Sequence, residues 1–173
     1  MTPALFETAR LRCRRWRRDD LDALFAVYAD PLAMRFVGDG QPITREQCHE
    51  WLDVTERNYA QRGYGMFALE DRTSDTVIGF CGLVHPGGQE EPEVKYAFRR
   101  SAWGRGLASE MVPALLAHGS QTHGLTRIIA TVAPGNEPSQ RVLLKAGAVR
   151  QPDRVNGDGS TTWVYEWHAP RTA

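Results

Sequence analysis

Hydrophobic and polar positions along this chain follow two periods, and each period predicts one kind of element. Where apolar residues alternate with polar ones, or form short β-branched runs, we predict strands. Where they recur three and four positions apart, as in the row Leu107, Met111 and Leu115, we predict a helix buried along one face. The predicted strands are 5–16, 66–70, 77–84, 94–98 and 125–132, with a final pair at Val149 and 161–167.

Residues that favour helix ends set the boundaries of the predicted helices. Thr44 and Gln47 have the spacing of a capping box, which predicts a helix from there to about Tyr59. Pro138 and Gly147 stand at the first position and past the end of another helix, as expected from their conformations. The remaining predicted helices run from Asp19-Asp20 to Tyr28, with Asp30-Pro31 as the stop, and from 107 to just before Gly124.

The order of these elements predicts a mixed α/β fold. The strands at 94–98 and 125–132 are separated by a long helix, so we expect them to lie parallel. The strands at 66–70 and 77–84 are joined by a polar turn and predict a hairpin. Since no repeat or linker interrupts the chain, we expect one domain over 1–173, with about seven strands in a twisted mixed sheet between flanking helices.

Composition and charge exclude several classes of function. The 21 basic residues balance 21 acidic ones, so no overall field attracts nucleic acid or an anionic membrane. Six arginines fall between Arg10 and Arg18, but no aromatic series accompanies them, and we interpret them as a solvated strand face. Cys13, Cys48 and Cys81 lack the spacing of metal ligands, which favours reduced thiols and no structural metal. Without a signal peptide or membrane-spanning run, we expect a cytoplasmic protein.

A glycine loop between the predicted strand at 94–98 and the long helix indicates an anion site. Main-chain N–H groups at a helix start lack partners inside the helix, and the helix dipole adds positive potential. Gly104 and Gly106 allow close approach of the backbone, and we expect Arg99, Arg100 and Arg105 to add positive charge. The loop lacks the Gly-Lys-Ser/Thr of a P-loop and the third glycine of a dinucleotide fingerprint. Taken alone, it could equally be a plain strand-to-helix turn.

A second segment decides between these interpretations. Together with the glycine loop, the run from Asn136 through Ser139 to Gly147 resembles the GNAT acyltransferase superfamily. The likeness covers nearly the whole chain, including Thr8-Ala9-Arg10-Leu11-Arg12 and Val77-Ile78-Gly79. Within the superfamily, the chain is most similar to the branch of ribosomal-protein N-terminal alanine and serine acetyltransferases.

The resemblance implies a site for acetyl-CoA between two parallel central strands that splay apart. It implies that the main chain of three strand residues, Tyr96, Ala97 and Phe98, pairs with the pantetheine arm. It also implies that Asn136 binds this arm and that Ser139 lies near the sulfur, although both residues could merely cap their helix. The N–H groups implied to hold the pyrophosphate are those of Arg105, Gly106, Leu107, Ala108 and Ser109.

The activity implied is transfer of the acetyl group to a primary amine by direct attack in a ternary complex. Such a reaction needs a proton acceptor for the amine and a donor for the departing thiolate. Glu93 is the candidate base, through water, and Ser139 the candidate donor, with His85 and Glu91 as further possible bases. Cys81 lies inside a predicted strand, so we interpret it as core rather than as a nucleophile.

Several questions stay open at this stage. The acceptor could be a protein N-terminus, a polyamine, an amino acid or an aminoglycoside, and the protein a monomer or homodimer. The alternative to an enzyme is a GNAT-fold module that binds CoA or a partner without turnover. Pro113 interrupts the long helix and removes its bond to the Ser109 carbonyl, so we expect a kink or local defect there.

Overall fold

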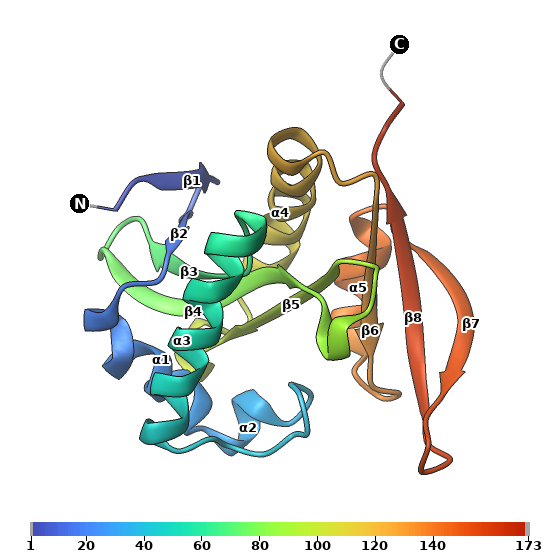
Figure 1. Ribbon diagram of the computed structural model, residues 1–173, viewed down its shortest axis with the longest axis horizontal. Helices are drawn as coiled ribbons and strands as arrows, with labels where there is room; N and C mark the ends of the chain where they lie inside the picture. The colour runs from blue at the N-terminus through green and yellow to red at the C-terminus, as the bar shows by residue number, and fades with distance from the viewer. Residues whose placement is uncertain (1, 172–173) are drawn as a thin grey trace.

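The computed structural model describes residues 2–171, and their strands form one open, mixed sheet (Figure 1). Within these residues the sheet has eight strands in the order β1-β2-β3-β4-β5-β6-β8-β7. All neighbouring strands are antiparallel except β5 and β6, which are parallel, as predicted from the helix between them. The strands are β1 Ala4–Glu7, β2 Leu11–Arg15, β3 Met66–Asp71, β4 Thr76–Val84, β5 Glu93–Phe98, β6 Arg127–Val132, β7 Val149–Val155 and β8 Thr161–His168.

Five α-helices within the same residues flank the sheet. They are α1 Leu21–Tyr28, α2 Pro31–Met34, α3 Arg45–Arg62, α4 Leu107–His123 and α5 Glu137–Lys145. Short 3-10 turns lie at Arg18–Asp20, Pro86–Gly88 and Arg100–Ala102. None of the helices in residues 2–171 combines the length and apolarity needed to cross a membrane.

The eighth strand arises because a turn divides the region predicted as one strand over 5–16. The Thr8 N–H donates to the Leu11 carbonyl at 2.9 Å, and the Thr8 hydroxyl accepts from the Leu11 N–H at 3.1 Å. This tight turn separates β1 from β2, which then pair antiparallel. Local hydrogen bonding at one residue therefore adds a strand without changing the predicted fold class.

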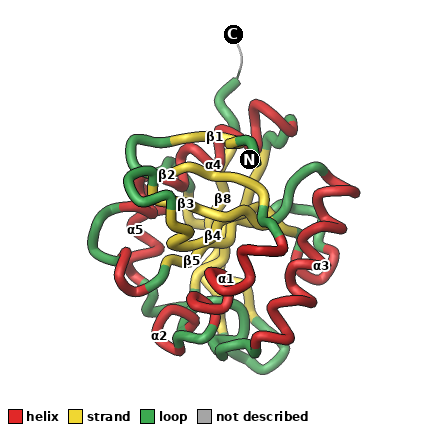
Figure 2. Tube along the Cα trace, turned by 90° about the vertical axis from the view of Figure 1, so that its left-hand side faces the viewer, coloured by secondary structure: helices red, strands yellow, loops and turns green. Residues whose placement is uncertain are grey.

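Alternating side chains of the central strands build a core on each face of the sheet. On β3, Phe67 and Leu69 pack with Met111 and Leu115 of α4 on one face. Ala68 belongs to the other core, with residues of α1 and α3 such as Leu24 and Leu52. Figure 2 shows this three-layer arrangement, with α5 and α3 on opposite sides of the strands.

Helix boundaries follow the predicted caps, with one addition. The Thr44 hydroxyl accepts from the Gln47 N–H at 3.1 Å, and the Gln47 side chain accepts from the Thr44 N–H at 2.8 Å. Asp30-Pro31 ends α1 as predicted, but Asp30 also caps α2, since its carboxylate accepts from the Leu32 N–H at 3.0 Å. Sequence reasoning missed this one-turn helix because four residues are too few to show a period.

Pro113 does not interrupt α4, which continues as one helix from Leu107 to His123. Pro113 lies on the exposed face of the helix. Because proline has no N–H, the Ser109 carbonyl has no hydrogen-bond donor at position 113, but solvent can supply one on this exposed face. The expected defect is therefore limited to one missing hydrogen bond.

Arg14 contradicts the interpretation of the basic segment as a solvated face. Its side chain is only 3% exposed and donates to both carboxylate oxygens of Asp20, at 2.8 and 2.9 Å. It also donates to Glu70 on β3 at 2.9 Å. This arginine can be buried because two carboxylates satisfy its charge and its N–H donors, a circumstance that the alternation of β2 alone does not indicate.

Candidate functional site

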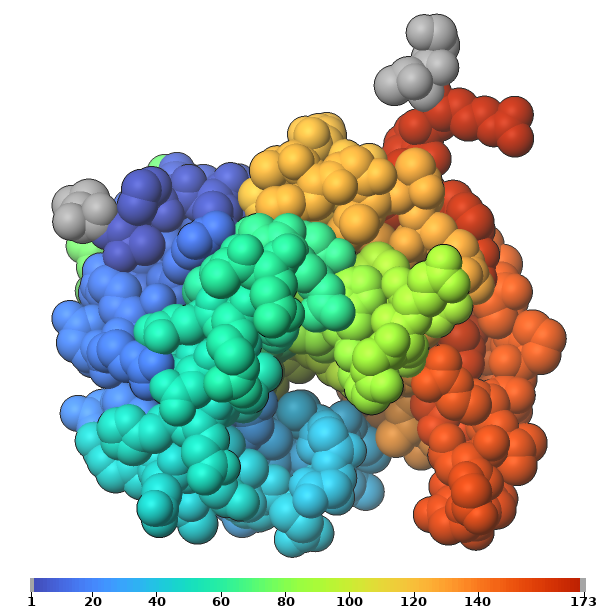
Figure 3. All heavy atoms as spheres, in the orientation of Figure 1, coloured from blue at the N-terminus to red at the C-terminus, as the bar shows by residue number. Residues whose placement is uncertain are grey.

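The two parallel strands part after a single contact. β5 and β6 share one register pair, Glu93 with Ile129, and the Ile129 N–H donates to the Pro92 carbonyl at 2.9 Å. Beyond this point the strands diverge and a cavity of about 620 Å³ opens between them. Figure 3 shows the surface hollowed between the blue segment that contains α2 and the orange C-terminal part of the chain.

The edge of β5 that faces this gap is formed by alternate residues. The Arg99 N–H donates to the Ile78 carbonyl of β4 at 2.8 Å, whereas Pro92 bonds to β6. Main-chain groups alternate between neighbours along a strand, so Tyr96 and Phe98 face the gap. Tyr96 has no register partner on β6. The Phe98 carbonyl accepts from the Trp103 indole N–H at 2.9 Å.

Ala97 differs from the expectation that its main chain binds a ligand. It pairs with Phe80 of β4, and the same alternation directs its N–H and carbonyl away from the gap. Ala97 still belongs to the cavity lining. The expectation treated three successive residues alike, although only every second one can present its backbone to the same side.

The loop before α4 presents unpaired N–H groups to the cavity. Gly104 and Gly106 both have φ of 73°, in the left-handed region that favours glycine. α4 begins at Leu107, and Glu110 is the first residue whose N–H bonds back, to the Gly106 carbonyl at 3.2 Å. The N–H groups of Leu107, Ala108 and Ser109 therefore have no helical partner, as at any helix start. All three residues line the cavity.

The turn between β1 and β2 supports this loop from behind. Arg10 donates to the Arg105 carbonyl at 2.7 Å and to the Glu110 carboxylate at 2.9 Å. Glu110 also accepts from the Thr8 hydroxyl at 2.5 Å. Burial alone raises the pKa of Glu110, but its bonds to Thr8 and Arg10 outweigh burial and lower that pKa overall. The segment that carried part of the family resemblance thus fixes the loop.

The three arginines expected to surround an anion each contact an acceptor on another element, although Arg105 also lines the cavity. Arg99 donates to the Val77 carbonyl at 2.7 Å. Arg100 forms a two-pronged pair with Asp30 at 2.8 and 2.9 Å, and Arg105 reaches Asp71 at 3.4 Å. Proximity in sequence predicted a cluster of cations, but each guanidinium has an acceptor on another element. The loop therefore offers an anion chiefly its main-chain N–H groups and the positive end of the α4 dipole.

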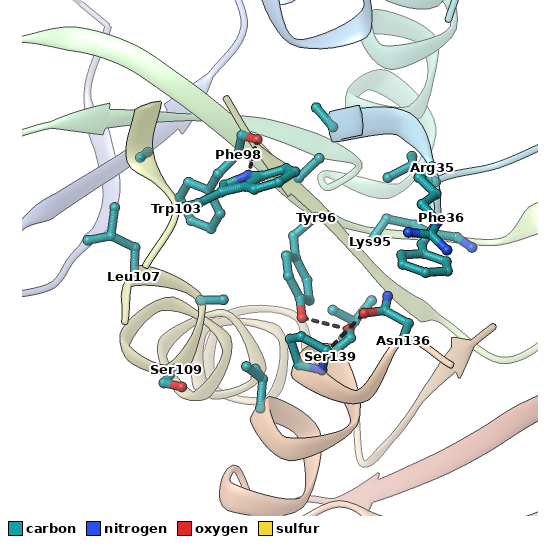
Figure 4. Close-up of a pocket in the computed structure, with 18 of the residues that line it drawn as sticks. Arg35, Phe36, Lys95, Tyr96, Phe98, Trp103, Leu107, Ser109, Asn136 and Ser139 are labelled. Carbon is teal, nitrogen blue, oxygen red and sulfur yellow. Dashed lines mark hydrogen bonds between the residues drawn. The ribbon is translucent and has the colours of Figure 1, made fainter. Parts of the chain in front are cut away.

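Two hydroxyl groups meet across the cavity where α5 begins. The Tyr96 hydroxyl lies 2.7 Å from the Ser139 hydroxyl (Figure 4). The Asn136 side chain accepts from the Ser139 N–H at 3.4 Å and caps α5, as the simpler interpretation predicted. Burial raises the pKa of Tyr96, although its bond to Ser139 acts in the opposite direction. Tyr96 is therefore a neutral hydroxyl that can donate a hydrogen bond to Ser139.

Glu93 is buried at the point where β5 and β6 meet. Its side chain is 2% exposed and lies 2.5 Å from the Lys95 ammonium. It accepts from the Thr131 hydroxyl at 3.0 Å and from the Gln89 amide at 3.3 Å. Glu93 does not line the cavity, whereas Lys95 and Thr131 do. The carboxylate therefore reaches the cavity only through its hydrogen-bonded neighbours.

The other candidate groups lie outside the cavity lining. His85 bonds to the Tyr64 hydroxyl at 2.8 Å and to the Gln89 carbonyl at 3.0 Å, and Glu91 pairs with Arg127 at 3.5 Å. Cys81 is fully buried, 3.9 Å from the sulfur of Cys13, which confirms its interpretation as core. Burial raises the pKa of the Cys13 thiol well above its ordinary value.

Sequence reasoning missed one wall of the cavity. Leu32, Arg35 and Phe36, in and just after α2, line it opposite α5. Leu32 and Phe36 are large apolar residues that remain 52% and 40% exposed. Their spacing of four could have suggested one side of a helical turn, but no local feature connects that turn with β5.

Comparison with known proteins identifies relatives over most of the chain. Residues 10–149 match the family model described as the acetyltransferase (GNAT) domain. YoaA, an uncharacterized N-acetyltransferase of Bacillus subtilis, is 30% identical over 174 residues, which cover 96% of this chain and 98% of that protein.

Solved structures share the fold. An acetyltransferase from Agrobacterium tumefaciens superposes with a TM-score of 0.82 at 24% identity, over 98% of this chain and 96% of that one. The ribosomal-protein acetyltransferase RimL, in complex with coenzyme A, gives a TM-score of 0.81 at 16% identity, over 96% of this chain and 98% of that one.

Proposed function

Because the chain belongs to the GNAT family of acetyltransferases, we propose that it transfers the acetyl group of acetyl-CoA to a primary amine. The observation that carries this proposal is the open edge of β5, which leads from unpaired N–H groups at the start of α4 into a cavity of about 620 Å³. The family model and this continuous sheet also support one acetyltransferase domain over 1–173.

The residues present fit acetyl-CoA. A Cβ built at Gly104 would meet no atom of residues 2–171 within 4 Å, apart from its chain neighbours, so the loop leaves open space where a diphosphate can approach. The N–H groups of Arg105, Gly106, Leu107, Ala108 and Ser109 are the proposed diphosphate donors. The main chain of Tyr96 and Phe98 would bind the pantetheine arm as an added strand does, with the Asn136 amide beside it. The structure of RimL, which has the same fold, contains coenzyme A, and this supports the proposal that the fold can hold acetyl-CoA.

Ser139 is the proposed donor to the departing sulfur. Bound acetyl-CoA supplies an acyl thioester, and its thiolate needs a proton or a hydrogen bond as it leaves. The Tyr96 hydroxyl, 2.7 Å from Ser139, can hold the proton of Ser139 in the direction of the cavity by donating its own hydrogen bond. Ser139 is thus the proposed catalytic group, and Tyr96 orients it.

Glu93 is the proposed final acceptor of the amine proton. The carboxylate is buried, but the Thr131 hydroxyl lines the cavity and donates to it at 3.0 Å. The Thr131 hydroxyl passes its proton to Glu93 and takes up the proton of the amine in its place, directly or through a water beside it. Lys95 lies 2.5 Å from the same carboxylate and forms an ion pair with it.

Direct transfer in a ternary complex is the proposed order of events. Cys81 is buried away from the cavity and has no histidine among its hydrogen-bond partners in residues 2–171, so it lacks the arrangement of an activated nucleophile. The splayed strands instead hold thioester and amine in one cavity, which supplies proximity.

The decisive experiment measures thiol release from acetyl-CoA with a mixed panel of amines. Ser139→Ala should lower kcat by up to about 100-fold, the lower end of general acid catalysis, because a thiol is already a moderate acid. Tyr96→Phe should lower kcat less and leave the KM for acetyl-CoA nearly unchanged. Cys81→Ala should stay active.

Two results would contradict the proposal. A folded chain that binds acetyl-CoA but releases no thiol with any amine would be a binding module rather than an enzyme. Acetyl found on Cys81 that passes into product would replace direct transfer by an acetyl-enzyme route.

A further inference from the structure

The cavity walls carry positive charge without any acidic side chain. Among residues 2–171, the charged residues that line the cavity are Arg35, Lys95 and Arg105, and no aspartate or glutamate lines it. An amine acceptor is itself cationic before it loses a proton. A cavity that binds a polyamine or an aminoglycoside would be expected to present carboxylates. The positive charge of these walls therefore favours an acceptor that also carries a negative group.

The three cations lie at two different ends of the cavity. Arg105 belongs to the loop before α4, where it reaches Asp71 at 3.4 Å. Arg35 and Lys95 lie on the α2 side of β5, whereas Tyr96 points to the opposite side, toward Ser139 (Figure 4). Lys95 is two residues from Glu93, where β5 and β6 meet. The Arg35 and Lys95 end is therefore where an arm laid along β5 from the α4 loop would terminate.

Arg35 is the available cation at this end. Lys95 forms an ion pair with Glu93 at 2.5 Å, but Arg35 forms no ion pair with any residue from 2 to 171. Its guanidinium lies 4.9 Å from the centre of the Phe36 ring, which holds it by cation–π attraction and leaves its N–H donors for another partner. A guanidinium with free donors binds a carboxylate in a two-pronged geometry.

Exposed apolar residues line the cavity, two of them beside this cation. Leu32, Phe36 and Trp103 are three of the seven exposed large apolar residues within the described chain, and all three line the cavity. Leu32 and Phe36 lie with Arg35 on the same wall. An acceptor at this wall can thus bury an apolar group beside the carboxylate that Arg35 binds.

From this arrangement, and on the basis of the proposed function, we infer that the acceptor is a small amine with a carboxylate and an apolar side chain, as in apolar α-amino acids. The carboxylate would bind Arg35, the apolar side chain would contact Leu32 and Phe36, and the amine would face the end of the β5 gap. Polyamines lack a carboxylate and are repelled by the unpaired charge of Arg35. A protein N-terminus has an amide where this wall favours a carboxylate.

Matched pairs of acceptors test the inference. Leucine and phenylalanine are compared with leucinamide and phenylalaninamide, with spermidine and with an alanine-initiated peptide, and kcat/KM is expressed per free amine. The two amino acids should exceed their amides by about tenfold or more, the effect of one two-pronged charged hydrogen bond. In Arg35→Gln this ratio should fall to within about twofold, while Arg57→Gln, which removes an exposed charge from α3, should leave it unchanged.

The outcomes separate the inference from the proposed function. Calorimetry of acetyl-CoA with the parent and with Arg35→Gln should give equal affinities, which shows that the variant is folded and that Arg35 does not bind the cofactor. Equal or faster transfer to the amides, to spermidine or to the peptide would overturn the acceptor class and leave the transferase standing. An amino acid preference that survives Arg35→Gln would also overturn it. Failure of the parent to bind acetyl-CoA would instead refute the proposed function.

Discussion

Gly106 lies where a residue with a side chain is strained, and a Cβ there would lie 3.8 Å from the Arg10 guanidinium that supports the loop. Its φ is 73°, and it immediately precedes the unpaired N–H groups of α4. Gly106→Val should cost about 1–2 kcal/mol of stability through left-handed strain. It should also weaken acetyl-CoA binding about tenfold or more, because the branched side chain displaces the N–H donors from the diphosphate. Calorimetry and thermal unfolding measure the two effects.

Gly87 offers a matched control for that substitution. Its φ is 63°, a Cβ there would meet nothing within 4 Å, and it does not line the cavity. Gly87→Val should be strained similarly but bind acetyl-CoA like the parent. Arg105→Ala should weaken binding by only about 0.3–1 kcal/mol, the effect of one exposed charge near a helix start. Unchanged affinity in Gly106→Val would refute the role of the loop.

At the scale of elements, Arg14 joins β2, β3 and the turn that precedes α1. Arg14→Met leaves the carboxylates of Asp20 and Glu70 buried without their cation, and should destabilise the protein by about 3–5 kcal/mol in urea unfolding. Arg12→Met, on the same face of β2 but with a side chain that is 30% exposed, should change stability much less. Similar losses for both variants would contradict the assignment of Arg14 as a buried link.

The same network predicts sensitivity to acid. Burial on its own raises the pKa of Asp20, but hydrogen bonds from Arg14 and Arg17 outweigh it and lower that pKa below its ordinary value of 3.8. The unfolded chain therefore binds this proton more readily. The stability that Asp20 contributes is complete above about pH 3.8 and is lost as the pH falls through the lower folded value. In Asp20→Asn, the free energy of unfolding should no longer fall with acid through this group, as urea unfolding at a series of pH values would show.

Pro113 gives a prediction of opposite sign for α4. Pro113→Ala restores an N–H that can bond to the Ser109 carbonyl on the exposed face of an unbroken helix. The protein should gain up to about 3 kcal/mol of stability, measured by urea unfolding. The affinity for acetyl-CoA should not change, since the N–H groups at the helix start are unaffected. No gain would show that Ser109 already has an equivalent partner.

At the scale of the whole molecule, the proposed acetyl-CoA site is formed by segments that only the folded chain brings together. The open edge of β5, the start of α4 and the start of α5 meet at one cavity. At a concentration about 100-fold above its dissociation constant, acetyl-CoA should stabilise the fold by about 2.7 kcal/mol, a clear rise in Tm. ATP and NADH should raise Tm much less. A nucleotide that matched acetyl-CoA would place the phosphate site in another class.

Much of this molecule is predictable from sequence because the relevant forces act between close neighbours. The Thr44 and Gln47 box, the Asn136 cap and the apolar row of α4 involve residues within a few positions of each other. The parallel pairing of β5 and β6 follows from the helix that joins them. The GNAT family was likewise identified from motifs, and the family model confirms it.

Tertiary structure decided which partner each side chain and each backbone edge received. Arg14 is buried because Glu70, 56 positions away, satisfies it, and Arg100 turns from the loop toward Asp30, 70 positions away. The position of β4 fixes which way Ala97 presents its backbone. α2 forms a cavity wall only because the fold brings it against β5. Periodicity and helix caps involve residues close in sequence and can be predicted from it, whereas contacts between distant segments depend on how the whole sheet and its helices pack.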